Sequence, residues 1–101
     1  MPDPNFRQPR QADEKYLAHV RTLPCCLCGD NVSVEAHHPR TVDEPQGYRY
    51  TGLGVKPSDQ WAVPLCGRHH RQLHTMNERE FWASYGVDPY AIAMRIRMPD
   101  P

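Results

Sequence analysis

Three short segments of this chain are crowded with cysteine and histidine, at spacings that metal sites in proteins use. The segments are Cys25-Cys26-Leu27-Cys28, Ala36-His37-His38 and Cys66-Gly67-Arg68-His69-His70-Arg71-Gln72-Leu73-His74. One tetrahedral zinc site takes four ligands, and these segments offer more than that. The surplus predicts two metals, one that holds the fold together and one that takes part in chemistry.

Metal binding explains the four cysteines better than disulfides do. A chain of 101 residues builds one small domain with a modest core, for which a metal is a common support. The cysteines share their segments with histidines, and the polar N-terminus does not resemble a secretory signal. The sequence has no apolar run of membrane-spanning length. We therefore expect a zinc-bound, cytoplasmic protein with no membrane partner.

Capping residues, prolines and glycines predict a small α+β domain. Residues 1–12 are expected to form a flexible arm, and residues 13–101 a single domain. The predicted helices run from Asp13 to about Thr22, from Gly67 to Thr75, from Asn77 to Tyr85 and from Asp88 to about Arg97. The predicted strands cover Val32–Ala36 and Trp61–Leu65, and a long loop from Pro39 to Ser58 separates them.

The cysteines and one histidine predict a closed structural zinc site. On a helix, residues three or four apart share a face, so His69 can point toward Cys66. With Cys25 and Cys28 they make a Cys₃His set, which is a common structural zinc site. The spacing also allows His70 in place of His69. Cys26 is then the spare thiol and is expected to be a small buried side chain.

The remaining histidines predict a second, open metal site. His70 and His74 lie one helical turn apart. His37 and His38 are neighbours at the end of a predicted strand, so their side chains point to opposite sides and have different roles. One of them can join His70 and His74 as a ligand, and the other can act as a general base. The alternative is a single zinc site, with the other histidines playing no part in metal binding.

These segments, in this order, resemble the HNH endonucleases. The resemblance covers about Leu23 to His74. Within the family, the chain most resembles a branch found in phages and prophages, and it is also similar to a RecA-dependent phage nuclease. That branch carries a G-x-G-x-K-x-x-D segment, matched here by residues 52–59. The resemblance implies a small zinc-stapled ββα-metal (His-Me finger) domain, with helices flanking it at both ends.

The resemblance also implies a role for each site residue. His37 corresponds to a metal ligand and His38 to the general base, while His70 and His74 complete the site for a divalent metal such as Mg²⁺, Mn²⁺, Ni²⁺ or Zn²⁺. The family has an asparagine before the second strand, which orients the base or supports the hairpin, and this chain has no asparagine there. Asp59 or Gln60 takes that place, and the narrower branch has aspartate there, which favours Asp59.

The implied activity is hydrolysis of DNA phosphodiester bonds. The net charge is zero, but ten of the twelve basic residues are arginine, which suits phosphate contacts. A GC-rich genome would produce the same arginine content. Five basic residues flank the predicted site and are candidates for DNA binding, although each is also explained as a solvated surface charge: Arg40, Arg49, Lys56, Arg68 and Arg71.

A non-catalytic zinc module that binds DNA or protein in phage recombination is the alternative function. Such a module would need the Cys₃His set but not the other four histidines of the three segments. Their presence favours the nuclease, with DNA and possible recombination or phage proteins as partners. We expect a monomer or a weak dimer.

Overall fold

The computed structural model describes residues 12–40 and 59–98 of the chain. In order, the elements are helix α1 (Glu14–Arg21), strand β1 (Val34–His37), the 3₁₀ turn η1 (Asp59–Trp61), strand β2 (Val63–Cys66), and the helices α2 (Gly67–Leu73), α3 (Glu78–Tyr85) and α4 (Pro89–Arg97). The predicted α+β class is confirmed. Most of the predicted arm (1–11) and of the predicted long loop (41–58) lies outside the described residues.

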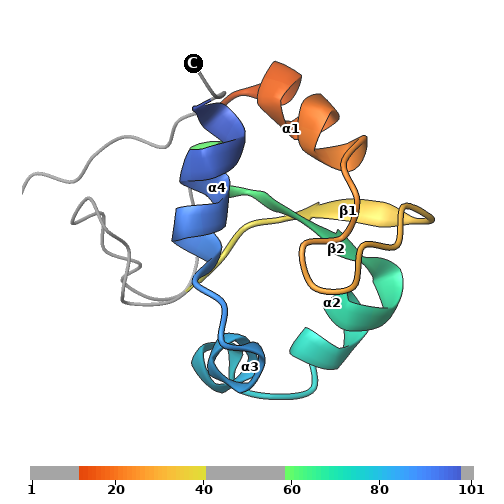
Figure 1. The fold of residues 1–101 in the computed structure, drawn as a ribbon, viewed down its shortest axis with the longest axis vertical. Helices are drawn as coiled ribbons and strands as arrows, with labels where there is room; N and C mark the ends of the chain where they lie inside the picture. Colours follow the sequence, from red (N-terminus) through yellow and green to blue (C-terminus); the bar gives the residue numbers. More distant parts are fainter. Residues whose placement is uncertain (1–11, 41–58, 99–101) are drawn as a thin grey trace, which may run out of the picture.

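A two-stranded antiparallel hairpin lies at the centre of the fold, and helices cover it on both faces (Figure 1). Val34 pairs with Cys66 and His37 pairs with Val63. All four residues of β2 are buried. Because successive strand residues point to opposite faces, β2 contributes to packing on both sides of the hairpin.

Helix α1 covers one face of the hairpin. The Asp13 side chain accepts a hydrogen bond from the Tyr16 backbone N–H at 3.0 Å, as predicted for an N-cap. Tyr16, Leu17 and Val20 form the buried stripe of the helix, and they pack with Ala62. The Tyr16 hydroxyl donates a hydrogen bond to the Ala62 carbonyl at 2.8 Å. Together these contacts fix α1 against the start of β2.

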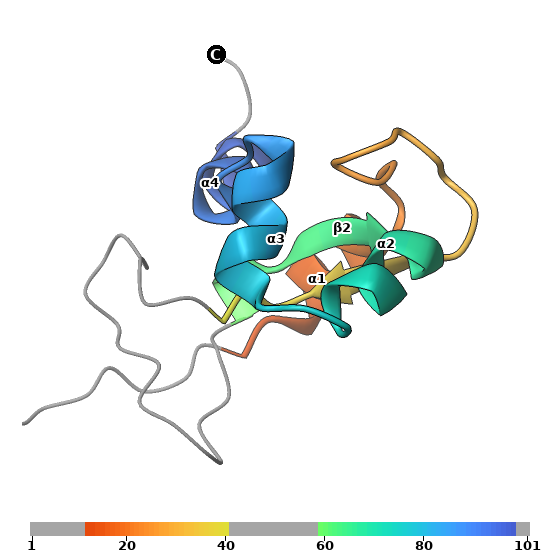
Figure 2. The same cartoon turned by 90° about the horizontal axis from the view of Figure 1, so that it is seen from below.

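Helices α2, α3 and α4 pack against the other core cluster (Figure 2). It contains Val63 and Leu65 from β2 together with Phe81, Trp82, Tyr90 and Ala93 from the last two helices. Trp61 also lies there, 1% exposed and edge-on to Tyr90, so this side chain is part of the core. None of the helices in the described ranges has the length and apolar composition of a membrane span.

The predicted limits of α3 and α4 are confirmed by their caps. Asn77 accepts a hydrogen bond from the Glu80 backbone N–H at 3.1 Å. Gly86 ends α3 in the left-handed conformation, with φ of 65°. Asp88 then caps α4, and Pro89 occupies its first turn. The sequence predicted these helix limits because a cap is formed by neighbouring residues and does not depend on the rest of the fold.

The predicted limits of both strands were wrong by one or two residues. β1 begins at Val34 and not at Val32, because Ser33 has a φ of 57° and interrupts the extended backbone. β2 begins at Val63, because residues 59–61 form a 3₁₀ turn. Pro64 lies within β2. Its carbonyl accepts from the Cys26 N–H, so its nitrogen faces away from β1. The helix predicted to reach Thr75 ends at Leu73.

Replacement of Gly86 tests the cap of α3. We expect Gly86→Ala to lower the free energy of unfolding by roughly 1 kcal/mol, because a Cβ disfavours the left-handed conformation. Gly86→Asn should cost less, since asparagine adopts this conformation more readily. Urea unfolding followed by circular dichroism measures both. Equal stability of the alanine variant and the wild type would contradict the account of this cap.

Candidate functional site

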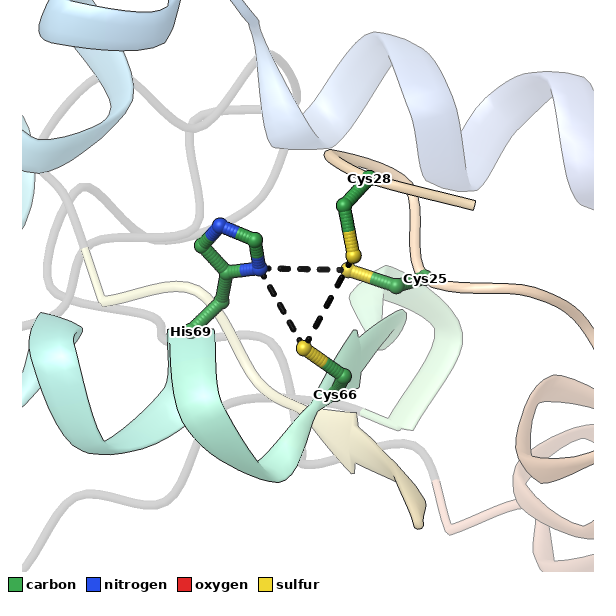
Figure 3. A group of neighbouring side chains, drawn as sticks. All are labelled: Cys25, Cys28, Cys66 and His69. Carbon is green, nitrogen blue, oxygen red and sulfur yellow. Dashed lines mark hydrogen bonds between the residues drawn. The ribbon is translucent and has the colours of Figure 1, made fainter. Parts of the chain in front are cut away.

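Four side chains from three parts of the chain converge into one Cys₃His cluster (Figure 3). Cys25 and Cys28 come from the segment after α1, Cys66 ends β2, and His69 lies on α2. Their ligand atoms all lie within 4.8 Å of one another. His69 Nδ1 is 3.2 Å from Cys66 Sγ and 3.8 Å from Cys25 Sγ, and the sulfurs of Cys28 and Cys66 are 3.9 Å apart.

These distances fit a tetrahedral zinc ion. Two thiolates bound to one zinc at ~2.3 Å lie about 3.8 Å apart, and a thiolate and an imidazole nitrogen lie slightly closer. Three thiolates and one imidazole are also the donors that zinc prefers. The prediction that these four side chains gather into a set that can bind a metal is therefore confirmed. The spacing had left His69 and His70 as alternatives, and the structure selects His69.

The backbone of the segment that carries Cys25 and Cys28 prepares the site. The Cys25 carbonyl accepts a hydrogen bond from the Gly29 N–H at 2.9 Å, and Gly29 has a φ of 77°, which a residue with a Cβ disfavours. The Leu27 N–H points at the Cys25 sulfur at 3.4 Å. The Cys26 N–H donates to the Pro64 carbonyl at 3.0 Å, which joins this tight turn to β2.

The surroundings of the cluster favour a neutral imidazole at His69. Burial, helped by the neighbouring Arg68, lowers the pKa of His69 and so favours the neutral imidazole that a metal ligand needs. The Arg68 side chain lies against Cys28 and Cys66, and this contact raises the pKa of Arg68. Cys26 lies outside the cluster, as predicted, and burial raises its pKa to about 12. It therefore stays a neutral thiol at neutral pH.

A histidine–carboxylate pair lies at the end of the hairpin. His38 Nε2 and Asp59 Oδ1 are 2.8 Å apart, although 21 residues separate them in the sequence. The Asp59 carboxylate is buried, and its other oxygen accepts from the Asp13 backbone N–H at 2.8 Å. The His38 side chain is 26% exposed. Asp59 therefore holds one nitrogen of His38 and leaves the ring open to solvent.

His37, the last residue of β1, and His70 of α2 form a second pair. His37 Nδ1 lies 3.1 Å from His70 Nε2. The outer nitrogens of both rings face carboxylates: His37 Nε2 lies 2.9 Å from Glu78, and His70 Nδ1 lies 3.3 Å from Glu35. If each outer nitrogen donates its N–H to a carboxylate, the two inner nitrogens both present lone pairs. A shared proton or a cation between them relieves their repulsion.

His74 lies beside His70, but its side chain is more exposed than those of His37 and His70. Its ring centroid is 4.7 Å from that of His70, and its side chain is exposed. Across residues 12–40 and 59–98, no second group of three or more cysteine, histidine or carboxylate side chains is gathered as closely as the Cys₃His cluster. The structure therefore brings His37, His70 and His74 side by side, with His37 and His70 as the well-defined pair.

Glu78 is a site residue that the sequence did not indicate. One of its oxygens accepts from His37 Nε2, from the Trp82 indole N–H at 3.0 Å and from the Arg40 backbone N–H at 3.1 Å. Burial alone would raise the pKa of Glu78, but these hydrogen bonds outweigh it and leave the pKa lowered. A glutamate in the first turn of a helix is ordinary, so nothing in the sequence marked this one out.

The predicted DNA-binding residues do not all lie at the histidine site. Arg40 follows β1 and lies next to Glu78. Arg68 lies against the Cys₃His cluster, and the Arg71 guanidinium folds back toward Gly67 at the start of α2. Arg49 and Lys56 lie outside the described residues. Of the five, Arg40 is the one whose backbone contacts a partner of the His37 side chain, namely Glu78.

Comparison with known proteins gives the family. Residues 2–98 match the family model described as "Protein of unknown function (DUF968)". The chain belongs to this family. It is also similar to the uncharacterized protein YdfU of Escherichia coli (strain K12), with 39% identity over 66 residues. The aligned part covers 65% of this chain and 17% of that protein, so the chain spans much less than two thirds of this relative's length. No solved structure matches the chain.

Removal of one cysteine at a time tests the Cys₃His assignment. We expect the wild type to retain about one tightly held zinc per chain after dialysis, and Cys28→Ser to lose it, because a closed zinc site needs four ligands. Cys26→Ser, a neighbouring cysteine outside the cluster, should retain the metal. Elemental analysis of the purified proteins measures both. Loss of zinc from Cys26→Ser with retention in Cys28→Ser would contradict the assignment.

Proposed function

We propose that this chain is an HNH-type endonuclease that hydrolyses phosphodiester bonds in DNA with the help of a divalent metal. The observation that carries the proposal is the pair formed by His38 and Asp59 at 2.8 Å, next to the pair formed by His37 and His70 at 3.1 Å. One pair suits a general base with its orienting carboxylate, and the other suits metal binding.

The order of the elements supports this proposal. An antiparallel pair of strands, β1 and β2, is followed directly by helix α2. The histidine pair 37–38 ends the first strand, and His70 and His74 come from the helix and its end. This is the arrangement that the resemblance to HNH endonucleases implies for a ββα-metal site.

The residues at the second site fit a divalent metal. Two imidazole nitrogens bound to one metal at ~2.1 Å lie about 3.0–3.4 Å apart, and the inner nitrogens of His37 and His70 are separated by 3.1 Å. Carboxylates behind both rings are the usual outer partners of metal-binding histidines. His37 and His70 would hold the ion, with His74 beside them. A divalent ion held there would supply Lewis-acid stabilisation of charge on the phosphate and on the leaving 3′ oxygen.

His38 is the base in the reaction that we propose. With Nε2–H donated to Asp59, the neutral ring carries its lone pair on Nδ1. That nitrogen accepts a proton from water as the water oxygen attacks the phosphorus atom. The bond from phosphorus to the 3′ oxygen breaks, and the 3′ oxygen takes a proton from solvent. The products are a 5′ phosphate and a 3′ hydroxyl. The buried Asp59 carboxylate stabilises the imidazolium that forms.

Replacement of His38 tests the proposed activity. We expect the zinc-loaded wild type to convert supercoiled plasmid to nicked or linear DNA when Mg²⁺, Mn²⁺ or Ni²⁺ is added. His38→Ala should slow cleavage by about 10²–10⁴-fold, the usual loss when a general base is removed. Asp59→Asn should cost about 10–100-fold, because the amide holds the ring less well. Gel electrophoresis measures all three rates.

His19→Ala is the matched control, because His19 is an exposed histidine on α1 and is not among the side chains of the hairpin site. It should cleave at the wild-type rate. A folded, zinc-loaded wild type that cleaves neither plasmid nor single-stranded or branched DNA with any of these metals would contradict the nuclease. That result would favour the alternative of a zinc module that binds DNA or protein without cleaving it.

A further inference from the structure

We propose that Glu78 is a positioning residue, which orients His37 so that its inner nitrogen faces the metal. This inference rests on the proposed function, because it assumes a metal between His37 and His70. It adds to that function a residue of α3, which lies outside the hairpin and helix that carry the histidines.

The contacts of Glu78 make it a rigid support. Three N–H donors reach one oxygen, from His37, from Trp82 and from the Arg40 backbone, at 2.9, 3.0 and 3.1 Å. The donors come from the end of β1, from the next turn of α3 and from the segment after β1. Because the carboxylate is fixed from three directions, it can fix the His37 ring in turn.

The hydrogen bond to Glu78 determines which nitrogen of His37 is available. A carboxylate accepts hydrogen bonds and does not donate, so Nε2 of His37 carries the hydrogen. In the neutral ring, the lone pair is then on Nδ1, the atom that lies 3.1 Å from His70 Nε2. Without the carboxylate, the ring could adopt the other tautomer or rotate. Either change would remove a lone pair from the proposed metal position.

Glu35 is a natural comparison, because it has the same relation to His70. It is the weaker support of the two. Its side chain is 47% exposed, against 13% for Glu78. Its oxygens lie 3.3 Å from His70 Nδ1, against 2.9 Å for the contact of Glu78 with His37. Water competes with an exposed hydrogen bond, so the effect of Glu35 should be smaller.

Metal affinity gives a direct test that does not depend on cleavage. Zinc-loaded wild type, Glu78→Ala, Glu78→Gln and Glu80→Ala would be titrated with Mn²⁺ and followed by electron paramagnetic resonance. Glu80 is the matched control, because it is an exposed glutamate in the same first turn of α3. We expect Glu78→Ala to bind Mn²⁺ 10–100-fold more weakly. Glu78→Gln should recover part of the loss, since the amide oxygen still accepts from His37. Glu80→Ala should match the wild type.

A nuclear magnetic resonance measurement separates positioning from general support of the fold. Long-range ¹H–¹⁵N correlation of the zinc-loaded, Mn²⁺-free protein reports the tautomer of His37. We expect the Nε2–H form in the wild type and in Glu78→Gln, and a mixture in Glu78→Ala. Equal zinc content and thermal unfolding would show that the variants are folded.

The outcomes distinguish this inference from the proposed function. Unchanged Mn²⁺ affinity and an unchanged His37 tautomer in Glu78→Ala would overturn the role of Glu78. His37→Ala serves as the reference for the site itself. If His37→Ala binds Mn²⁺ as tightly as the wild type, the metal does not lie at His37, and the metal-binding part of the proposed function fails.

Discussion

The Cys₃His cluster is the constraint on which the rest of the structure depends. It joins the turn after α1, the last residue of β2 and the first helical turn after the hairpin. A domain of this size buries little apolar surface, so a metal bound by these four ligands from three segments would add much of the order that a larger core provides. By joining Cys66 and His69 to Cys25 and Cys28, such a metal would fix the rotation of α2 about its own axis, and thereby the direction of the other side chains on that helix.

That rotation explains how neighbouring histidines come to differ. His69 points into the cluster, and His70, about 100° further round the helix, points toward His37 on β1. The strand separates its own pair in the same way, because successive residues face opposite sides. His37 faces His70 and Glu78, whereas His38 faces Asp59. The four histidines therefore lie in three environments. His69 belongs to the Cys₃His cluster, His37 and His70 face each other, and the partly exposed His38 is held by the buried carboxylate of Asp59.

The sequence predicted the parts of the fold that depend on local chemistry. The caps at Asp13, Asn77 and Asp88 and the Cys₃His spacing belong to this group, because a few neighbouring residues determine each of them. The pairing of His38 with Asp59 was expected from the family resemblance, not from local pattern. Strand limits were less accurate, since Ser33 adopts a positive φ that no local signal announced. Glu78 was missed because its role depends on the docking of α3 against β1, which brings together residues 41 positions apart.

The central claim is that the chain carries two metal sites of different kinds, held next to each other by one hairpin and one helix. Anomalous X-ray diffraction from crystals of the zinc-loaded protein soaked in Mn²⁺ tests it most directly. We expect a zinc peak among Cys25, Cys28, Cys66 and His69, and a separate manganese peak between His37 and His70. A zinc peak alone, or manganese bound away from these histidines, would contradict the account of the second site.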